Sequence, residues 1–208
     1  MSAAHPLQNR VNPSGELVAT TARGALMGNR GGRFHNADRT LGRRRWASRQ
    51  WIACVCEFKG RHREVFGVGY TELFFLDEPT ALAAGHRPCF ECRRAEAKLF
   101  QRFFPGAPKN VAAMDAALHA ERLDGRGQRR WRARIGDLPD GAMFAWEKRP
   151  YALRDRRALP WSFAGYGEPT PLDAALEVDV LTPTSTVAAL RAGYAPRWPD
   201  AQMAPRLD

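Results

Sequence analysis

The chain has 208 residues, 44% of them hydrophobic, and a formal net charge of +10. This length and hydrophobic content suit one compact domain or two small ones, and they argue against a disordered chain. The sequence contains no run of 18 apolar residues and no apolar N-terminal segment, which argues against a membrane-spanning or secreted protein and favours the cytoplasm.

The positive charge comes from 28 arginines and only four lysines. Arginine suits a phosphate-binding protein because its guanidinium fork matches phosphate oxygens, although a GC-rich genome also favours arginine. Position is more informative than number, since residues 23–63 hold eleven lysines or arginines but only two acids, Asp38 and Glu57. This stretch is therefore the predicted electropositive face.

The first residues of the chain predict little structure. Residues 1–22 contain few large apolar side chains and an Asn-Pro-Ser-Gly turn, so we expect a poorly ordered arm. Residues 25–27 predict a short strand, and a glycine-rich loop follows at residues 28–35. Its glycines let backbone N–H groups approach an anion, which makes the loop a candidate phosphate contact; an ordinary hairpin turn is the alternative. His35 closes the loop and is either a zinc or substrate ligand or a surface histidine.

The run Arg43-Arg44-Arg45-Trp46-Ala47-Ser48-Arg49-Gln50-Trp51 interleaves cations with two indoles. Cations contact phosphates and indoles stack on bases, so this mixture favours nucleic-acid binding. The predicted nucleic-acid contacts of the whole chain are Arg30, Arg33, Arg43, Arg44, Arg45, Trp46, Arg49, Arg87 and Arg93.

Residues 51–58 predict a strand, with Lys59-Gly60 as a turn and residues 61–68 as its hairpin partner. Because side chains alternate along a strand, Cys54 and Cys56 share one face and can point towards the same neighbour. They are candidate zinc ligands, together with His62 at the start of the returning strand. The alternative is that both cysteines are small core residues, as free cysteine often is.

The strongest local signals surround Cys89-x-x-Cys92. Residues 73–76 predict a buried strand, Asp77 a helix cap and Gly85 the end of a short helix. We expect Arg87-Pro88 to open a second helix with both cysteines in its first turn, where the helix dipole lowers thiol pKa values. The pair predicts half of a zinc site; a redox pair and an inert buried pair are the alternatives.

At these residues the chain resembles the N-terminal metal-binding domain of the Ada DNA-repair proteins, over about residues 71–94. The matching residues are Phe74, Phe75, Ala81, Ala84, Gly85, Arg87, Pro88, Cys89, Cys92 and Arg93. The family takes its other two zinc ligands from an upstream Cys-x-x-x-Cys pair, whose first thiolate accepts a methyl group from a DNA phosphotriester. This chain lacks that pair and offers Cys54-Val-Cys56 and His62, so the resemblance implies zinc and DNA more than methyl transfer.

The second half of the chain changes in character. Residues 112–123 predict a helix that carries His119, and residues 125–134 form a second basic run within a helix-and-linker segment, residues 105–134. Residues 135–208 predict a mostly β, barrel-like unit built from short strands and hairpin turns, with one helix near residues 184–192.

The sequence therefore predicts an α+β protein. A zinc-stabilised, Ada-like hairpin and helix module at residues 23–104 would precede the β unit. The predicted function is zinc-dependent nucleic-acid binding, with DNA the expected partner in a DNA-repair role. The alternatives are a zinc-thiolate methyl acceptor or zinc-dependent hydrolase, and a metal-free module that binds a protein or an anionic ligand.

Overall fold

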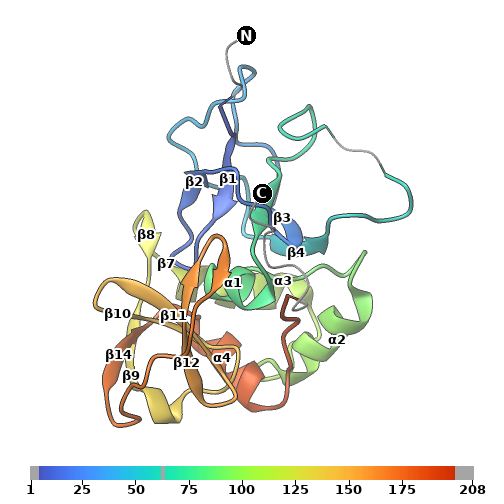
Figure 1. The fold of residues 1–208 in the computed structure, drawn as a ribbon. Helices are drawn as coiled ribbons and strands as arrows, with labels where there is room; N and C mark the ends of the chain where they lie inside the picture. Colours follow the sequence, from blue (N-terminus) through green and yellow to red (C-terminus); the bar gives the residue numbers. More distant parts are fainter. Residues whose placement is uncertain (1–4, 62–63, 200–208) are drawn as a thin grey trace.

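The computed structural model describes residues 5–61 and 64–199. Two six-stranded sheets form separate layers, and helices α1 and α3 lie between them (Figure 1). The expected mixture of helices and strands is confirmed. None of the helices in the described part of the chain has the length and apolar character needed to cross a bilayer.

The N-terminal sheet has the strand order β2-β1-β5-β3-β4-β6. Its strands are β1 (Gln8–Val11), β2 (Leu17–Ala19), β3 (Leu26–Arg30), β4 (Trp51–Val55), β5 (Leu73–Phe75) and β6 (Arg87–Pro88). Strand β3 pairs antiparallel with β4 and β5, whereas β6 pairs parallel with β4. The strand predicted at residues 73–76 is confirmed as β5.

The poorly ordered arm predicted at residues 1–22 is wrong for the residues that the structure describes. Strands β1 and β2 form an antiparallel pair that adds to the sheet through β5. Val11 and Leu17 are buried in the same core as Phe75, and Gly15 adopts a φ of +77° in the connecting turn. A segment with few large apolar side chains is thus ordered because two of them, Val11 and Leu17, enter the core.

Two predictions around β4 also need correction. The segment after Lys59-Gly60 does not form the expected hairpin partner in its described residues, because β3 and β6 already occupy both edges of β4. Arg87 and Pro88 do not open a helix. They form β6, and the N–H of Cys89 extends the pairing by donating to the Ala53 carbonyl at 3.0 Å.

Helix α1 (Glu78–Ala83) connects the two layers. Asp77 caps it by accepting a hydrogen bond from the Thr80 N–H at 2.9 Å, and Gly85 follows it with a φ of +80°, as predicted. All six helical residues are buried, because one side of the helix packs on the N-terminal sheet and the other side on the C-terminal sheet. Its small side chains allow this close approach on both sides.

The C-terminal sheet has the order β13-β12-β11-β10-β14-β9. Its strands are β9 (Trp131–Arg134), β10 (Met143–Trp146), β11 (Arg149–Arg154), β12 (Arg157–Ser162), β13 (Gly165–Tyr166) and β14 (Glu177–Val180), and a separate ribbon comprises β7 (Leu123–Asp124) and β8 (Gly127–Gln128). The short strands and hairpin turns predicted for residues 135–208 are confirmed, for example by the antiparallel pair of β10 and β11. The barrel-like closure is wrong, because this sheet is open in the described residues, with β13 and β9 at its edges.

The main core lies between the C-terminal sheet and three helices, α2 (Arg94–Phe103), α3 (Val111–Arg122) and α4 (Thr184–Arg191). Phe100, Met114 and Phe144 are fully buried there. The sheet therefore buries its apolar face against helices instead of curling on itself, which removes the need for closure.

Candidate metal centre and basic pocket

Three cysteines from two separate segments meet on one face of the N-terminal sheet. Cys54 lies on β4, Cys89 directly follows β6, and Cys92 lies in the turn that precedes α2. Their sulfur atoms all lie within 4.8 Å of one another. The β4–β6 pairing places Cys89 beside Cys54. The Arg93 N–H donates to the Cys89 carbonyl at 3.0 Å, and this turn brings Cys92 close to the other two thiols.

Hydrogen bonds within this cluster separate the thiol pKa values. The pKa of Cys89 is lowered because its sulfur accepts hydrogen bonds from the Cys54 and Cys92 thiols, and the Glu91 N–H also points at it from 3.4 Å. The pKa of Cys54 is raised because its thiol donates to Cys89 and because it is buried. The geometry thus favours one thiolate in the cluster, and thiolate is the form that binds metal ions.

A pocket of about 350 Å³ opens over the thiols. Its walls include Phe58, Tyr70, Glu72 and Glu91. These carboxylates have partners of their own, since Glu91 pairs with Arg61 and Glu72 accepts the Phe66 N–H. The thiol cluster is therefore accessible from solvent on one side and packed against Met27 and Phe74 on the other.

The other predicted metal ligands are placed differently. Cys56 lies beyond the end of β4, is exposed, and has its thiol 3.5 Å from the Ala25 carbonyl oxygen. The two ring nitrogens of His35 lie 2.9 Å from the Thr71 hydroxyl and 3.0 Å from the Gly67 carbonyl, and its ring stacks on Phe66. Neither residue belongs to the thiol cluster. His62 lies outside the described residues.

Two predicted nucleic-acid contacts are instead buried in ion pairs. Arg87 binds Asp115 of α3 through two bonds of 2.8 Å, and Arg93 binds Glu78 of α1 at 2.7 Å. All four side chains are at most 7% exposed, so neither guanidinium is available to a phosphate. Both predictions are corrected, because the carboxylates that neutralise these arginines come from distant parts of the chain.

The remaining predicted contacts lie in two groups. Arg33, Arg43 and Arg44 are exposed around one open hollow of about 430 Å³. Arg30, Arg45 and Trp46 line a different and larger pocket of about 670 Å³. Arg49 is exposed, and its backbone carbonyl accepts a hydrogen bond from Arg122. The glycine-rich loop is shorter than expected, because Gly28, Asn29 and Arg30 belong to β3.

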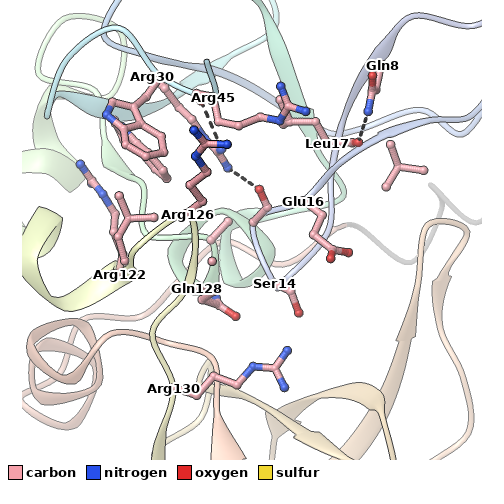
Figure 2. Close-up of a pocket in the computed structure, with 17 residues that line it drawn as sticks. Gln8, Ser14, Glu16, Leu17, Arg30, Arg45, Arg122, Arg126, Gln128 and Arg130 are labelled. Atoms are coloured by element: carbon pink, nitrogen blue, oxygen red, sulfur yellow. Dashed lines mark hydrogen bonds between the residues drawn. The ribbon is translucent and has the colours of Figure 1, made fainter. Parts of the chain in front are cut away.

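The larger pocket is strongly basic. Figure 2 shows arginines from several segments gathered around it, with Glu16 across from Arg122. Its lining contains five arginines and one acid, namely Arg30, Arg45, Arg122, Arg126, Arg130 and Glu16. Trp51 also lines this pocket, whereas Ile52 and Cys54 line the pocket over the thiols, so alternate residues of β4 serve opposite faces of one sheet.

At the base of the basic pocket, Arg30 and Arg122 both stack on the indole of Trp51, each with its guanidinium carbon 4.0 Å from the ring centroid. Both arginines are 2% exposed. The pKa of each is lowered to about 9, mainly by burial. The charge of Arg45 also lowers the pKa of Arg30, and the charge of Arg30 also lowers the pKa of Arg122. Among the described residues no carboxylate forms a salt bridge with either one. The charge of Asp115 raises the pKa of Arg122, but its carboxylate oxygens bind Arg87.

Two histidines adjoin this stack. His86 is fully buried against Trp51 and Phe75, and burial followed by the charges of Arg30 and Arg122 lowers its pKa well below the usual value. His119 Nδ1 lies 2.9 Å from Arg122, and its pKa is lowered by burial and by the same arginine. Both imidazoles are therefore neutral near pH 7, which limits the positive charge of the site.

Sequence reasoning did not identify Arg122, Arg126 and Arg130 as site residues. The only local signal was the basic run at residues 125–134, which contains two of them. Arg122 had no such signal, because its importance comes from contacts with residues of β4 and with Gly85 that are far away in the chain.

Comparisons with known proteins give no further information on this site. No family model, no curated protein and no solved structure matches the chain. The function must therefore be argued from the two sites themselves.

Proposed function

We propose that this chain is a zinc-containing nucleic-acid-binding protein, with DNA as its partner in a repair-associated role. The zinc site is supported by one observation: the sulfur atoms of Cys54, Cys89 and Cys92 lie within 4.8 Å of one another. Three thiolates are a donor set that zinc prefers, and a tetrahedral site with Zn–S bonds of about 2.3 Å has its sulfurs about 3.8 Å apart. A small contraction of the cluster would accommodate the ion.

A zinc ion at this position would also have a structural effect. It would join β4 to the turn between β6 and α2, two segments that are 35 residues apart at Cys54 and Cys89. The β6 strand has only two residues, and few backbone hydrogen bonds hold it to the sheet. Metal binding would therefore contribute to folding at a short strand pairing.

The nucleic-acid part of the proposal is supported by the distribution of charge. Exposed Arg33, Arg43 and Arg44 surround one hollow, and the next residues of the chain, Arg45 and Trp46, line the basic pocket. Unpaired guanidinium groups bind phosphates, and an accessible indole can stack on a base. The combination favours a nucleic acid over a protein partner.

The metal is tested by measuring zinc content and native mass of the full-length protein. We expect one zinc per chain in the wild type, loss of zinc in Cys89→Ser and Cys92→Ser, and full retention in Cys56→Ser, the matched control outside the cluster. Wild-type protein purified without chelator that contains no zinc and takes up none would refute this part. Equal zinc in Cys89→Ser and the wild type would exclude the cluster as its site.

Nucleic-acid binding is tested by the salt dependence of affinity for a labelled DNA strand and a labelled duplex. For each neutralised phosphate, log K should fall against log salt with a slope of about −0.7 for a strand or −0.9 for a duplex. We expect a slope that corresponds to several phosphates. Affinity that does not change between about 50 and 200 mM salt would show that phosphates are not the partner.

A second function is favoured by the pocket over the thiols. An ion held by only these three protein ligands would have a further coordination position for water or substrate, as in catalytic rather than structural sites, and the pocket over the thiols would give access to it. The centre would then be a zinc-thiolate methyl acceptor or a hydrolase with a zinc-bound water. Intact mass after incubation with methyl-phosphotriester DNA tests the first. A gain of one methyl group that requires Cys54, Cys89 or Cys92 supports it, and an unchanged mass contradicts it.

A further inference from the structure

The two buried arginines of the basic pocket differ from the other buried arginines of the chain. Arg87 and Arg93 each have a carboxylate partner within 2.8 Å. Arg30 and Arg122 are equally buried, yet their hydrogen-bond partners are backbone carbonyls and imidazole nitrogens. A buried guanidinium without an anion is unfavourable in a low-dielectric environment, so the difference needs an explanation.

The arrangement of these arginines does not follow from packing alone. Each guanidinium carbon lies 4.0 Å from the centroid of the Trp51 ring, so a single indole contacts both positive charges. In addition, Nε of Arg122 is buried and has no hydrogen-bond partner. Two like charges held against one ring, with one donor unsatisfied, are typical of a site prepared for an anion.

The pocket above the stack provides space and further charge for such an anion. Its volume of about 670 Å³ is within the range for a nucleotide-sized ligand. Arg126 and Arg130 extend from the β7–β8 ribbon and the segment after it, both are exposed, and no ion pair occupies either of them among the described residues. Figure 2 shows their side chains on the walls of the pocket, with Arg45 on another wall.

Trp46 adds a second type of contact. It is half-buried, lines the same pocket and lies with its ring centroid 5.9 Å from that of Trp51. An aromatic ring beside a phosphate-binding group of arginines is the combination that recognises an unpaired nucleotide, because the base stacks while its phosphate is neutralised. Bases within a duplex are not available for such stacking.

We propose that the pocket lined by Arg45, Arg126 and Arg130, over the Arg30–Trp51–Arg122 stack, binds one nucleotide of a single-stranded nucleic acid, with its phosphate among the arginines and its base on Trp46. The anion site follows from the charges alone. The choice of a strand over a free nucleotide rests on the proposed function. The phosphate of the bound nucleotide supplies the negative charge that Arg30 and Arg122 lack within the protein.

The test uses the full-length protein and three probes, which are a labelled single strand, a labelled duplex and a free nucleoside monophosphate, together with inorganic phosphate as a competitor that has no base to stack. The pocket variant is Arg126→Glu with Arg130→Glu; both side chains are exposed, so folding should be unaffected. Its control is Lys98→Glu with Arg102→Glu, which makes the same change in net charge on exposed positions of α2. Trp46→Ala separates base stacking from phosphate binding.

We expect the pocket variant to bind the single strand at least about tenfold more weakly, and the affinity of the control to change by less than about threefold. Trp46→Ala should weaken the binding of the strand more than it weakens the binding of inorganic phosphate. Equal losses in the pocket variant and the control would overturn the proposal, because the effect would then be one of diffuse charge. Tighter binding of the duplex than of the strand by the wild type would overturn the stacking part.

The outcomes also separate this inference from the proposed function. Binding of the nucleoside monophosphate but not of either DNA probe, with loss in the pocket variant, would retain the anion site and refute nucleic-acid binding. Strand binding that neither variant weakens would refute the pocket and leave the function standing. Failure of the wild type to bind any of the three probes would refute both.

Discussion

The buried ion pair between Arg87 and Asp115 allows a direct test of the corrected role of Arg87. The two side chains are 2% and 7% exposed and are joined by two bonds of 2.8 Å. In Asp115→Ala the guanidinium would keep only the Pro88 carbonyl as a polar partner. Removing one member of such a pair costs about 3–5 kcal/mol, because the remaining charge is left uncompensated.

The combined variant Arg87→Met with Asp115→Ala should be less destabilised than Asp115→Ala alone. Methionine fills much of the volume of the arginine stem and brings no charge into the interior. The free-energy cost of burying an uncompensated charge therefore disappears with the second substitution. A double-mutant cycle with Arg87→Met should therefore give a coupling energy of about 2 kcal/mol or more between the two positions.

The assay is urea unfolding followed by tryptophan fluorescence in zinc-containing buffer, with DNA-strand affinity measured separately on each folded variant. For a chain of this size, a loss of 3–5 kcal/mol lowers Tm by about 6–20 °C. Additive effects of the two single substitutions would refute the reasoning. A folded Arg87→Met variant that loses more strand affinity than the Lys98→Glu, Arg102→Glu control would restore Arg87 as a nucleic-acid contact.

Three further outcomes follow from single side chains. Burial raises the pKa of Asp77 from 3.8 to about 6, so the contribution of its protonated form to stability is complete below pH 3.8 and is lost as pH rises through 6. Relative to Asp77→Asn, the free energy of unfolding of the wild type should fall by up to about 3 kcal/mol between about pH 4 and 7. A difference that does not depend on pH would contradict this. Gly85→Ala combines a φ of +80° with a Cβ only 2.5 Å from Cδ of Arg122; we expect a loss of about 2 kcal/mol or more in urea unfolding together with weaker strand binding, and a neutral substitution would refute the clash. Tyr194→Phe removes the hydroxyl that donates to buried Glu78, which should cost about 1–3 kcal/mol, and unchanged Tm would show that Glu78 finds another donor.

Local sequence patterns predicted the parts of this protein that depend on near neighbours. The β5 strand, the Asp77 cap, the turn at Gly85, helix α3 and the hairpin of β10 and β11 all lie where residue spacing placed them. Each depends on residues within a few positions of one another, so alternation, capping and turn chemistry are sufficient. The same alternation correctly pointed Cys54 towards the Cys89 segment, whereas Cys56, predicted on the same face, lies beyond the end of β4 and outside the cluster.

The candidate site residues required knowledge of the tertiary structure. Sequence reasoning could not separate Arg87 and Arg93 from Arg30, because all three are arginines in basic or motif-rich stretches. In the fold, Asp115 and Glu78 neutralise the first two, whereas Arg30 stacks on Trp51 and donates to His86 and to backbone carbonyls, with no carboxylate partner. Whether a charge is structural or available to a ligand depends on partners 15 to 56 residues away in the chain, and only packing of distant segments brings these together.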